Sequence, residues 1–248
     1  MIEYAAAGGV ARITLNRPDK RNAITSGMMS ALRDALQHSA DDSTVRVVLI
    51  RGAGKDFCAG LDLSEVLKSA EDAQVSLASA RQLGDLYIAM RRHPKPIISA
   101  VQGRALGGGA GIATASDLII AAESAQFGYP EVKLGFIPAI VTTMLRRAVN
   151  ERQAMELALT GDPLSASRAH AISLINRVYP DAEFDTEVER YIARLAGQPA
   201  TAMSLSKHLL YATEGMSFEA SIEAGVQANV QARATDDFKR GVERFLKK

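Results

Sequence analysis

Two short, almost uninterrupted apolar runs constrain the fold of this chain more than any other feature of its sequence. They cover Val45 to Ile50 and Pro96 to Val101. Runs of this length, rich in β-branched residues, are typical of strands buried on both faces, as in parallel sheets. A helical pattern over residues 72–92 separates them and stops at Pro94, because proline cannot continue a helix. This order predicts a βαβ unit and therefore an α/β fold with a parallel sheet.

Local signals on both sides of this unit predict further elements. Residues 2–16 form an expected hairpin, whose Gly8-Gly9 pair supplies the positive φ that tight turns need. Thr25 or Ser26 is suited to cap a helix with an apolar face. Residues 117–122 predict a third buried strand.

The second half of the sequence has a different pattern. From residue 140 onward it is almost entirely helical, with one short strand expected near residues 177–179. The helical tail predicts a separate packing element. We therefore predict a catalytic core over residues 1–185 and a helical C-terminal region over residues 186–248.

Composition excludes several classes of function. The 248 residues include 29 Lys and Arg and 28 Asp and Glu, so a net charge of +1 gives no overall reason to expect nucleic acid. Cys58 is the only cysteine, which excludes an intrachain disulfide and suits a reducing compartment. The four histidines are too scattered for a zinc site. We find no signal-peptide pattern and no membrane-length apolar run, and we expect a cytoplasmic protein without a membrane segment.

A glycine-rich segment, Gly103–Gly111, follows the second buried strand. It is not a P-loop, because no Gly-Lys-Ser/Thr follows, and it is not a dinucleotide fingerprint, because the third glycine would fall on Ile112. Gly107-Gly108-Gly109 at a helix start leaves backbone N–H groups free to bind an anion or a developing oxyanion. The alternative is a tight turn that needs positive φ or close backbone packing. The motif alone favours neither.

Four segments together indicate a chemical function. They are Asn16–Ala23, Phe57–Leu63, Lys95 through Gly103 to Gly109, and Phe127–Glu131. In this order they resemble four segments of the enoyl-CoA hydratase/isomerase (crotonase) superfamily: a contact to the coenzyme A nucleotide, two oxyanion-hole loops, and the segment that bears a catalytic acid. The resemblance covers most of the chain, and its strength lies in the combination, since each segment alone is a weak match.

The resemblance implies roles for three residues. The backbone N–H groups of Leu61 and Gly108 would hold the thioester carbonyl oxygen, which becomes negative when the adjacent carbon loses a proton or when water adds to the alkene. One such donor typically lowers the barrier by about 3–4 kcal/mol. Glu131 would act as general acid or base, desolvated by Phe127, Tyr129, Phe136 and Ile137. The alternatives are a plain loop hydrophobe at Leu61 and a surface carboxylate at Glu131.

The sequence departs from the family pattern at two places. The best-known hydratases carry a second glutamate where this chain has Gly111, so the second carboxylate is absent. One carboxylate suffices to move a proton between two carbons, and Gly111 therefore favours isomerisation without excluding hydration. After Pro138 the chain has Ala139 to Thr142 instead of a glycine-rich turn, which predicts an acyl pocket of different shape.

Further residues match the family's contacts to coenzyme A. Lys20 and Arg21 are expected at the phosphates, where Lys and Arg act as charges and hydrogen-bond donors; a solvated basic turn is the alternative. Ala23, Ala59, Gly60 and Asp62 are expected to contact the rest of coenzyme A. In the final helix, Phe245 and Lys248 match residues that reach the nucleotide, often that of a neighbouring subunit. A solvated helix end is the alternative there.

The resemblance implies a spiral of ββα units followed by a helical C-terminal region that forms trimers, often paired into hexamers. It implies no metal or redox cofactor, since coenzyme A enters with the acyl-CoA substrate. The first hypothesis for function is an enoyl-CoA hydratase. The second is a Δ3-Δ2-enoyl-CoA isomerase with Glu131 as the sole proton shuttle, and the third is a non-catalytic acyl-CoA binding protein. Other enolate chemistries, such as decarboxylation, stay open.

Overall fold

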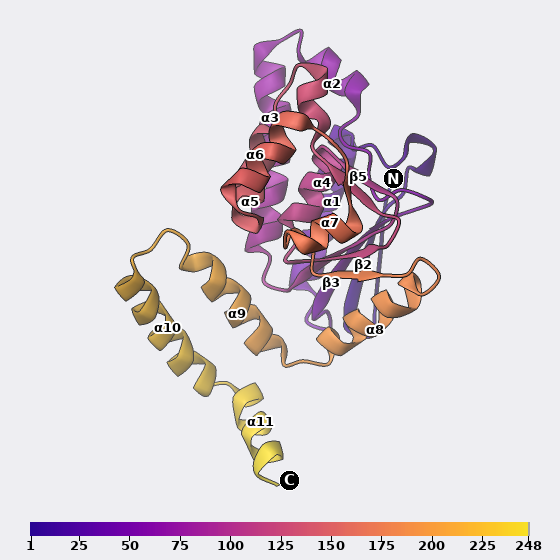
Figure 1. The fold of residues 1–248 in the computed structure, drawn as a ribbon. Coiled ribbons are helices and arrows are strands. Elements are labelled where there is room, and N and C mark those ends of the chain that lie inside the picture. Colours follow the sequence, from indigo (N-terminus) through magenta and orange to yellow (C-terminus); the bar gives the residue numbers. More distant parts are fainter. Residues whose placement is uncertain (248) are drawn as a thin grey trace.

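A mixed sheet lies at the centre of the molecule (Figure 1). In the computed structural model, which describes residues 1–247, this sheet has six strands in the order β1-β2-β3-β4-β6-β9. They are β1 (Ile2–Ala7), β2 (Val10–Leu15), β3 (Val47–Gly52), β4 (Ile97–Val101), β6 (Leu118–Ala122) and β9 (Arg177–Tyr179). The strands from β2 to β9 pair in parallel, and β1 pairs antiparallel with β2. The predicted α/β class is confirmed.

A small second sheet stands beside the first. Its strands, in the order β5-β7-β8, are β5 (Arg104–Leu106), β7 (Gln126–Gly128) and β8 (Leu164–Ser165). The sequence pattern misses all three, because runs of two or three residues show no periodicity. This sheet positions the site, since β5 leads directly into the glycine-rich turn.

Helices cover both faces of the large sheet. On one face lie α1 (Ser26–Asp41), α3 (Ala73–Arg92), α4 (Gly108–Ala115) and α5 (Ala139–Ala148), and the other face packs on α8 (Phe184–Ala196) (Figure 1). The remaining elements up to residue 171 are α2 (Leu63–Ser69), α6 (Glu151–Thr160), α7 (Ala166–Ala171) and two short 3-10 helices, Pro18–Lys20 and Pro130–Leu134. Along β3, Val48 and Ile50 face the first layer and Val47 and Leu49 face α8. Two covered faces explain the uninterrupted apolar run.

The predicted local signals hold in the structure. Gly8 and Gly9 have φ of 60° and 81° at the hairpin turn. The Thr25 hydroxyl caps α1 by accepting the Met28 amide at 3.2 Å. The helix predicted over residues 72–92 is α3, and its boundary differs by one residue.

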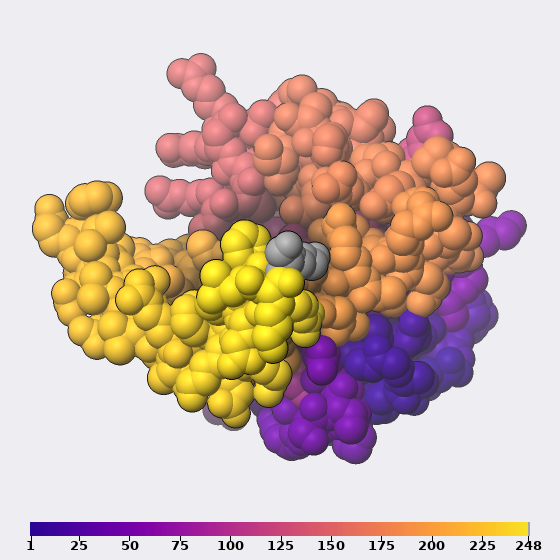
Figure 2. Space-filling view, turned by 90° about the horizontal axis from the view of Figure 1, so that it is seen from below, coloured from indigo at the N-terminus to yellow at the C-terminus, as the bar shows by residue number. Residues whose placement is uncertain are grey.

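Three helices form a C-terminal arm that projects from the rest of the chain. They are α9 (Ala200–Ala212), α10 (Phe218–Arg233) and α11 (Asp236–Leu246). Figures 1 and 2 show this arm, in gold and yellow, as an extension of the molecule. The arm begins after α8, which packs on the sheet, so the predicted division at residue 185 falls inside a core helix. Among residues 1–247, every helix is too short or too polar to span a lipid bilayer.

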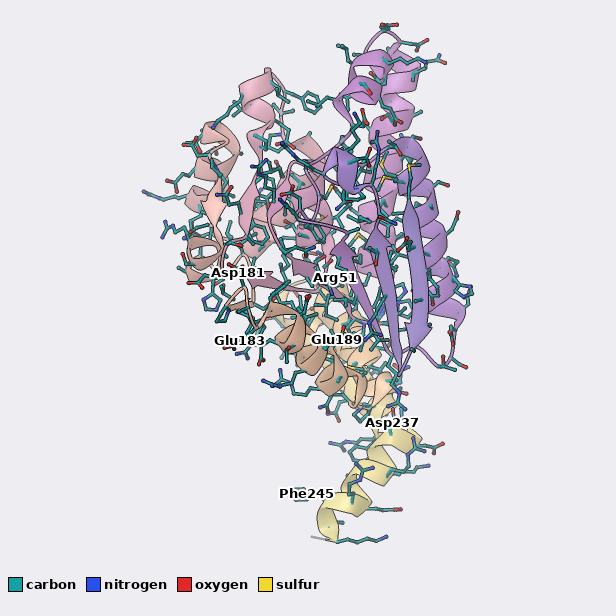
Figure 3. The ribbon with its side chains drawn as sticks, turned by 90° about the vertical axis from the view of Figure 1, so that its right-hand side faces the viewer. Arg51, Asp181, Glu183, Glu189, Asp237 and Phe245 are labelled. Atoms are coloured by element: carbon teal, nitrogen blue, oxygen red, sulfur yellow. The ribbon has the colours of Figure 1, made fainter. Side chains whose placement is uncertain are left out.

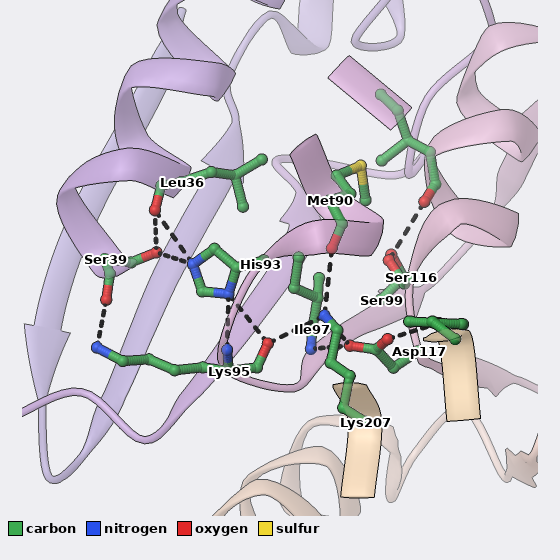
Figure 4. Close-up of polar contacts among 12 residues, drawn as sticks. Leu36, Ser39, Met90, His93, Lys95, Ile97, Ser99, Ser116, Asp117 and Lys207 are labelled. Atoms are coloured by element: carbon green, nitrogen blue, oxygen red, sulfur yellow. Dashed lines mark hydrogen bonds and ion pairs between the residues drawn. The ribbon is translucent and has the colours of Figure 1, made fainter. Parts of the chain in front are cut away.

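A buried ion pair attaches α9 to the core (Figure 4). The Lys207 ammonium lies 2.7 Å from the Asp117 carboxylate and donates to the carbonyls of Met90 and Lys95 at 3.2 Å. The Tyr211 hydroxyl donates to the other Asp117 oxygen at 2.7 Å. Burial lowers the pKa of Lys207, although the adjacent Asp117 charge opposes the shift. A buried charge of this kind is tolerated because each of its polar contacts is satisfied.

Candidate active site

The predicted coenzyme A segment runs alongside the first predicted oxyanion loop. The Ala59 amide donates to the Arg21 carbonyl at 2.9 Å. The Ile24 amide donates to the Gly60 carbonyl, and the Asp62 amide donates to the Ile24 carbonyl, each at 2.8 Å. These backbone bonds bring two segments together that are about forty residues apart in sequence.

Asn22 stabilises this arrangement from inside. It is fully buried and has a φ of 56°, a left-handed conformation that asparagine tolerates better than most residues. Its side-chain amide donates to the carbonyls of Ala53 and Asp56 at 2.9 and 2.8 Å, and its oxygen accepts the Arg17 amide at 2.9 Å. No separate role was predicted for Asn22. An asparagine in a turn rich in Pro, Asp and Asn is the signal that indicates it.

The second oxyanion loop and the Glu131 segment join the first loop through β5. The Cys58 amide donates to the Arg104 carbonyl at 2.9 Å, and the Leu106 amide donates to the Cys58 carbonyl at 3.0 Å. On its other side β5 pairs with β7, and the Gly107 amide donates to the Gly128 carbonyl at 2.9 Å. All four segments that the sequence singled out therefore meet in one place.

The amides of Leu61 and Gly108 are neighbours in this place. Gly108 is the first residue of α4, and a Cβ added to it would lie 3.5 Å from the Leu61 nitrogen. Neither amide donates a hydrogen bond to another group within residues 1–247. Two adjacent free N–H groups, one of them at a helix N-terminus, are suited to bind one oxygen that gains negative charge.

The glycine turn is also a close-packed turn. Gly107 has a φ of 49°, and a Cβ on Gly109 would lie 2.4 Å from the Cys58 carbonyl oxygen, which no side chain tolerates. The two interpretations of this motif that the sequence left open are thus compatible. The tight packing that requires glycine is what places the Gly108 amide beside Leu61.

Glu131 lies on the 3-10 helix after Tyr129, close to the glycine turn. Its Oε1 is 3.2 Å from the position of a Cβ on Gly107. Its Oε2 is buried and has no hydrogen-bond partner within residues 1–247. Burial raises the pKa of Glu131 above that of an ordinary carboxyl group. A partly desolvated carboxylate with a free oxygen is suited to take and return a proton.

The four residues expected to desolvate Glu131 differ in their own burial. Phe127 and Tyr129 are buried in the core. Phe136 and Ile137 are 56% and 64% exposed in this chain, and their share in desolvating Glu131 stays a prediction. The 3-10 helix ends at Gly135, which has a left-handed conformation.

The position of the absent carboxylate, Gly111, is closed. A Cβ on Gly111 would lie 2.0 Å from the Tyr87 hydroxyl oxygen. Tyr87 comes from α3 and is 4% exposed. No sequence pattern indicates this contact, because Tyr87 lies on a different helix.

The predicted coenzyme A contacts occupy varied environments. Lys20 and Arg21 are exposed, and Arg21 lines an open cavity of about 440 Å³ together with Lys55 and Arg104. Asp62 is already engaged in the fold, because its carboxylate caps α2. Hydrogen bonds from the Ser64 hydroxyl and from the Arg17 guanidinium, the latter at 2.6 Å, hold the pKa of Asp62 well below its ordinary range.

Ala23 and Ala59 are half-buried, and Gly60 is buried, at the junction of the two loops. Phe245 lies near the end of the arm and is 80% exposed (Figure 3). One chain therefore does not bring Phe245 to the other predicted contacts. Lys248 lies outside the described residues.

Cys58 is a packing residue. It is fully buried against Gly109, and burial raises the pKa of its thiol to about 12. Only the thiolate is nucleophilic, so this thiol is unreactive at neutral pH. Within residues 1–247, no cluster of three or more His, Cys, Asp or Glu side chains is arranged to hold a metal ion.

Known proteins resemble this chain over almost its whole length. The sequence pattern of the enoyl-CoA hydratase/isomerase family matches residues 5–248. A Thermus thermophilus protein that carries an enoyl-CoA hydratase name is 38% identical over 242 residues, which are 97% of this chain and 96% of that protein. The 1,2-epoxyphenylacetyl-CoA isomerase of Escherichia coli is 34% identical over 243 residues, which are 97% of this chain and 93% of the isomerase.

The fold agrees with these sequence matches. The crystal structure of human enoyl coenzyme A hydratase domain-containing protein 3 has a TM-score of 0.95 and 27% identity, and the match covers 99% of this chain and 97% of that one. The crotonase-like fold that the four segments implied is confirmed. The chain belongs to the enoyl-CoA hydratase/isomerase family.

Proposed function

We propose that this protein is an enoyl-CoA hydratase, which adds water across the 2,3 double bond of an enoyl-CoA thioester. The observation that carries the proposal is the meeting of two free amides, those of Leu61 and Gly108, with the desolvated carboxylate of Glu131. The name of the Thermus thermophilus relative supports the same reaction.

The reaction needs one acid–base group and one oxyanion site. The Glu131 carboxylate takes a proton from water as the water oxygen bonds to C3. The electron pair of the double bond moves toward C2 and the thioester oxygen, where the amides of Leu61 and Gly108 stabilise the enolate. Glu131 then returns its proton to C2, which restores the thioester and the carboxylate. The two main-chain donors stabilise the enolate and the transition states on either side of it, where the oxygen carries more negative charge than in the bound thioester.

The second candidate is isomerisation of a 3-enoyl-CoA to a 2-enoyl-CoA. Glu131 would take a proton from C2, the same amides would hold the dienolate, and Glu131 would return the proton to C4. The contact between Tyr87 and Gly111 favours this reaction, because it leaves no room there for a second carboxylate to orient water. The Escherichia coli relative is named an isomerase of a different coenzyme A thioester, 1,2-epoxyphenylacetyl-CoA, so isomerisation is represented among the relatives of this chain.

The proposal for substrate binding uses the residues that match the family's coenzyme A contacts. Lys20 and Arg21 are proposed to contact the coenzyme A phosphates, and Ala23, Ala59, Gly60 and Asp62 to line the adjacent stretch. Phe245 and Lys248 would contact the nucleotide bound to a neighbouring copy. This requires the arm to assemble into a homotrimer or hexamer, and its exposed apolar side chains support such assembly: Leu210, Met216, Phe218, Ile222, Val226, Val230, Phe238, Val242, Phe245 and Leu246.

The test is to incubate the protein separately with a short 2-enoyl-CoA and the matching 3-enoyl-CoA and to identify products by mass and chromatography. We expect the 2-enoyl substrate to gain water and Glu131→Gln to abolish the gain. Rearrangement of the 3-enoyl substrate without hydration would establish the second candidate instead. Binding of both without turnover would contradict both reactions and indicate an acyl-CoA binding protein.

A further inference from the structure

Tyr87 is the buried side chain that contacts the predicted oxyanion site from a separate element. It lies on α3, which packs against α4, and its ring belongs to the main core. The structure places its hydroxyl against the first turn of α4, where Gly108 begins the helix. Nothing in the reaction described above uses this group.

The first contact of Tyr87 is steric. A Cβ on Gly111 would lie 2.0 Å from the Tyr87 oxygen, 2.7 Å from Cζ and 3.3 Å from Cε2. Both helices are packed against the sheet, so neither backbone is free to withdraw. Even a methyl group at position 111 is therefore incompatible with the tyrosine.

The second contact is a hydrogen bond. The Tyr87 hydroxyl donates to the Gly108 carbonyl at 3.0 Å. On the same helix the Tyr129 hydroxyl bonds to Thr114 at 2.8 Å, and the Thr114 hydroxyl donates to the Ala110 carbonyl at 2.7 Å. Two buried phenols thus hold the short, glycine-rich α4, which has few side chains of its own to position it.

The surroundings keep Tyr87 a neutral donor. Burial raises its pKa well above that of an ordinary phenol, and the nearby Cys58, Tyr129 and Glu131 raise it further. A phenol that stays protonated offers a fixed O–H group at every pH at which the protein works. It does not compete with Glu131 for protons.

We propose that Tyr87 is a positioning and specificity-determining residue that takes the place of a second carboxylate. Its ring fills the volume that a side chain at position 111 would need, and its hydroxyl holds Gly108 so that the amide of this residue stays directed at the thioester oxygen. Glu131 is thereby left to move every proton alone. The proposal rests on the proposed thioester chemistry, and its tests include two that do not depend on turnover.

The steric part is tested by thermal unfolding of Gly111→Ala, Tyr87→Ala and the double variant. We expect Gly111→Ala to lower the melting temperature by more than about 5 °C in the natural background. In the Tyr87→Ala background the same substitution should cost little, because the space is open. An equal loss in both backgrounds would overturn the steric part.

The positioning part is tested with Tyr87→Phe, which keeps the ring and removes the hydroxyl. We expect kcat to fall about tenfold on whichever enoyl-CoA is turned over, with KM unchanged, as for loss of an interaction that matters in the transition state. The infrared stretch of the thioester carbonyl in a bound saturated acyl-CoA should move toward its value in solution. This second readout applies even if neither enoyl-CoA reacts.

Tyr211→Phe is the matched control, because it removes the hydroxyl of a half-buried, hydrogen-bonded phenol on the arm. It should leave both kcat and the carbonyl stretch unchanged. If Tyr87→Phe behaves like Tyr211→Phe in both readouts, the positioning role is wrong. If the carbonyl stretch responds but no enoyl-CoA is turned over, the positioning role stands and the proposed reaction fails.

The specificity part is tested by placing a carboxylate in the opened space. Tyr87→Ala combined with Gly111→Glu should raise the ratio of hydration to isomerisation above that of Tyr87→Ala alone. An unchanged ratio in a folded double variant would contradict the claim that Tyr87 excludes a second acid–base group.

Discussion

The central sheet and the C-terminal arm contain similar apolar side chains with opposite exposure. In β3, Val47, Val48, Leu49 and Ile50 are fully buried between two layers of helices. In α10 and α11 no residue of the described chain is buried, and Phe218, at 76% exposure, typifies their apolar side chains. The same kind of residue is core in one region and surface in the other.

This difference shows that burial depends on the partner and not on the residue alone. The sheet finds both of its partner layers within one chain. Within residues 1–247, ion pairs connect the arm to the core at α9, where Lys207 meets Asp117, and just after it, where Glu214 meets Arg91 and Arg147. Large exposed apolar patches on a globular protein mark interaction surfaces, so we infer that the arm completes its burial against another copy of this chain. The predictions below test this contrast, from the largest expected effect to the smallest.

Catalysis should depend on the core far more than on the arm. Glu131→Gln removes the only proton carrier of the proposed reactions, and we expect kcat to fall about 10³-fold, within the range for loss of a general acid–base group. Steady-state kinetics on the enoyl-CoA that reacts measures this. A Phe245→Ala control on the arm should raise KM, because Phe245 is proposed to contact the nucleotide. It should leave kcat near that of the natural protein. Similar losses of kcat in both variants would contradict a site built by the core.

The attachment of the arm should depend on its buried ion pair. Lys207→Met leaves the Asp117 carboxylate buried without its charge partner, which typically costs about 3–5 kcal/mol. We expect this cost to appear as a lower free energy of local opening of α9, which amide hydrogen exchange measures. The exposed pair Arg190 with Glu187 on α8 is the control, and Arg190→Met should have little effect, as expected of surface pairs. Unchanged exchange in α9 would show that other contacts hold the arm.

The same type of substitution, leucine to alanine, compares the sheet and the arm directly. Leu49→Ala in β3 should lower the free energy of unfolding by about 2–5 kcal/mol, through lost burial and the cavity that remains. Leu210→Ala in α9, where the side chain is 74% exposed, should cost less than about 0.5 kcal/mol. Denaturant unfolding at low protein concentration measures both. Equal costs would mean that the arm is packed as tightly as the sheet in the isolated chain.

The arm should matter for association. Ile222→Ser removes one exposed apolar side chain of α10, and full burial of such a side chain contributes about 1.5–3 kcal/mol. We therefore expect at least a tenfold weaker association per contact in sedimentation, with no loss of monomer stability. Glu219→Gln on the same helix is a polar control. Unchanged association of the Ile222→Ser variant would show that the interface lies elsewhere.

The smallest expected effect is the pH dependence of stability at Glu131. Burial raises its pKa in the folded state, so the folded protein holds this proton more tightly than the unfolded chain. The stability that the group contributes is complete below the unfolded pKa and is lost as pH rises through the raised folded pKa. Glu131→Gln should therefore be slightly more stable than the natural protein at neutral pH and equal to it in acid. A variant less stable at neutral pH would argue against desolvation of this carboxylate.

Much of the fold could be predicted because its signals are local. The hairpin turn at Gly8 and Gly9, the cap at Thr25 and the long helix α3 each depend on neighbouring residues. The strands of the small second sheet are too short to show a pattern, and α8 looks like the arm helices in sequence although it packs on the sheet. Its side chains Phe184, Val188 and Ile192 are core only because the second face of the sheet meets them.

The candidate site also combines features that the sequence predicts with features that depend on packing. Sequence alone determined the residue types that the chemistry needs: the glycine turn, one carboxylate at Glu131, and no carboxylate at Gly111. Only the tertiary structure decided that the Leu61 and Gly108 amides adjoin, that Asn22 locks one loop, and that Tyr87 closes the space at Gly111. The physical reason is that propensity and capping act between neighbours in the chain, whereas steric exclusion and desolvation depend on which distant segments packing brings together.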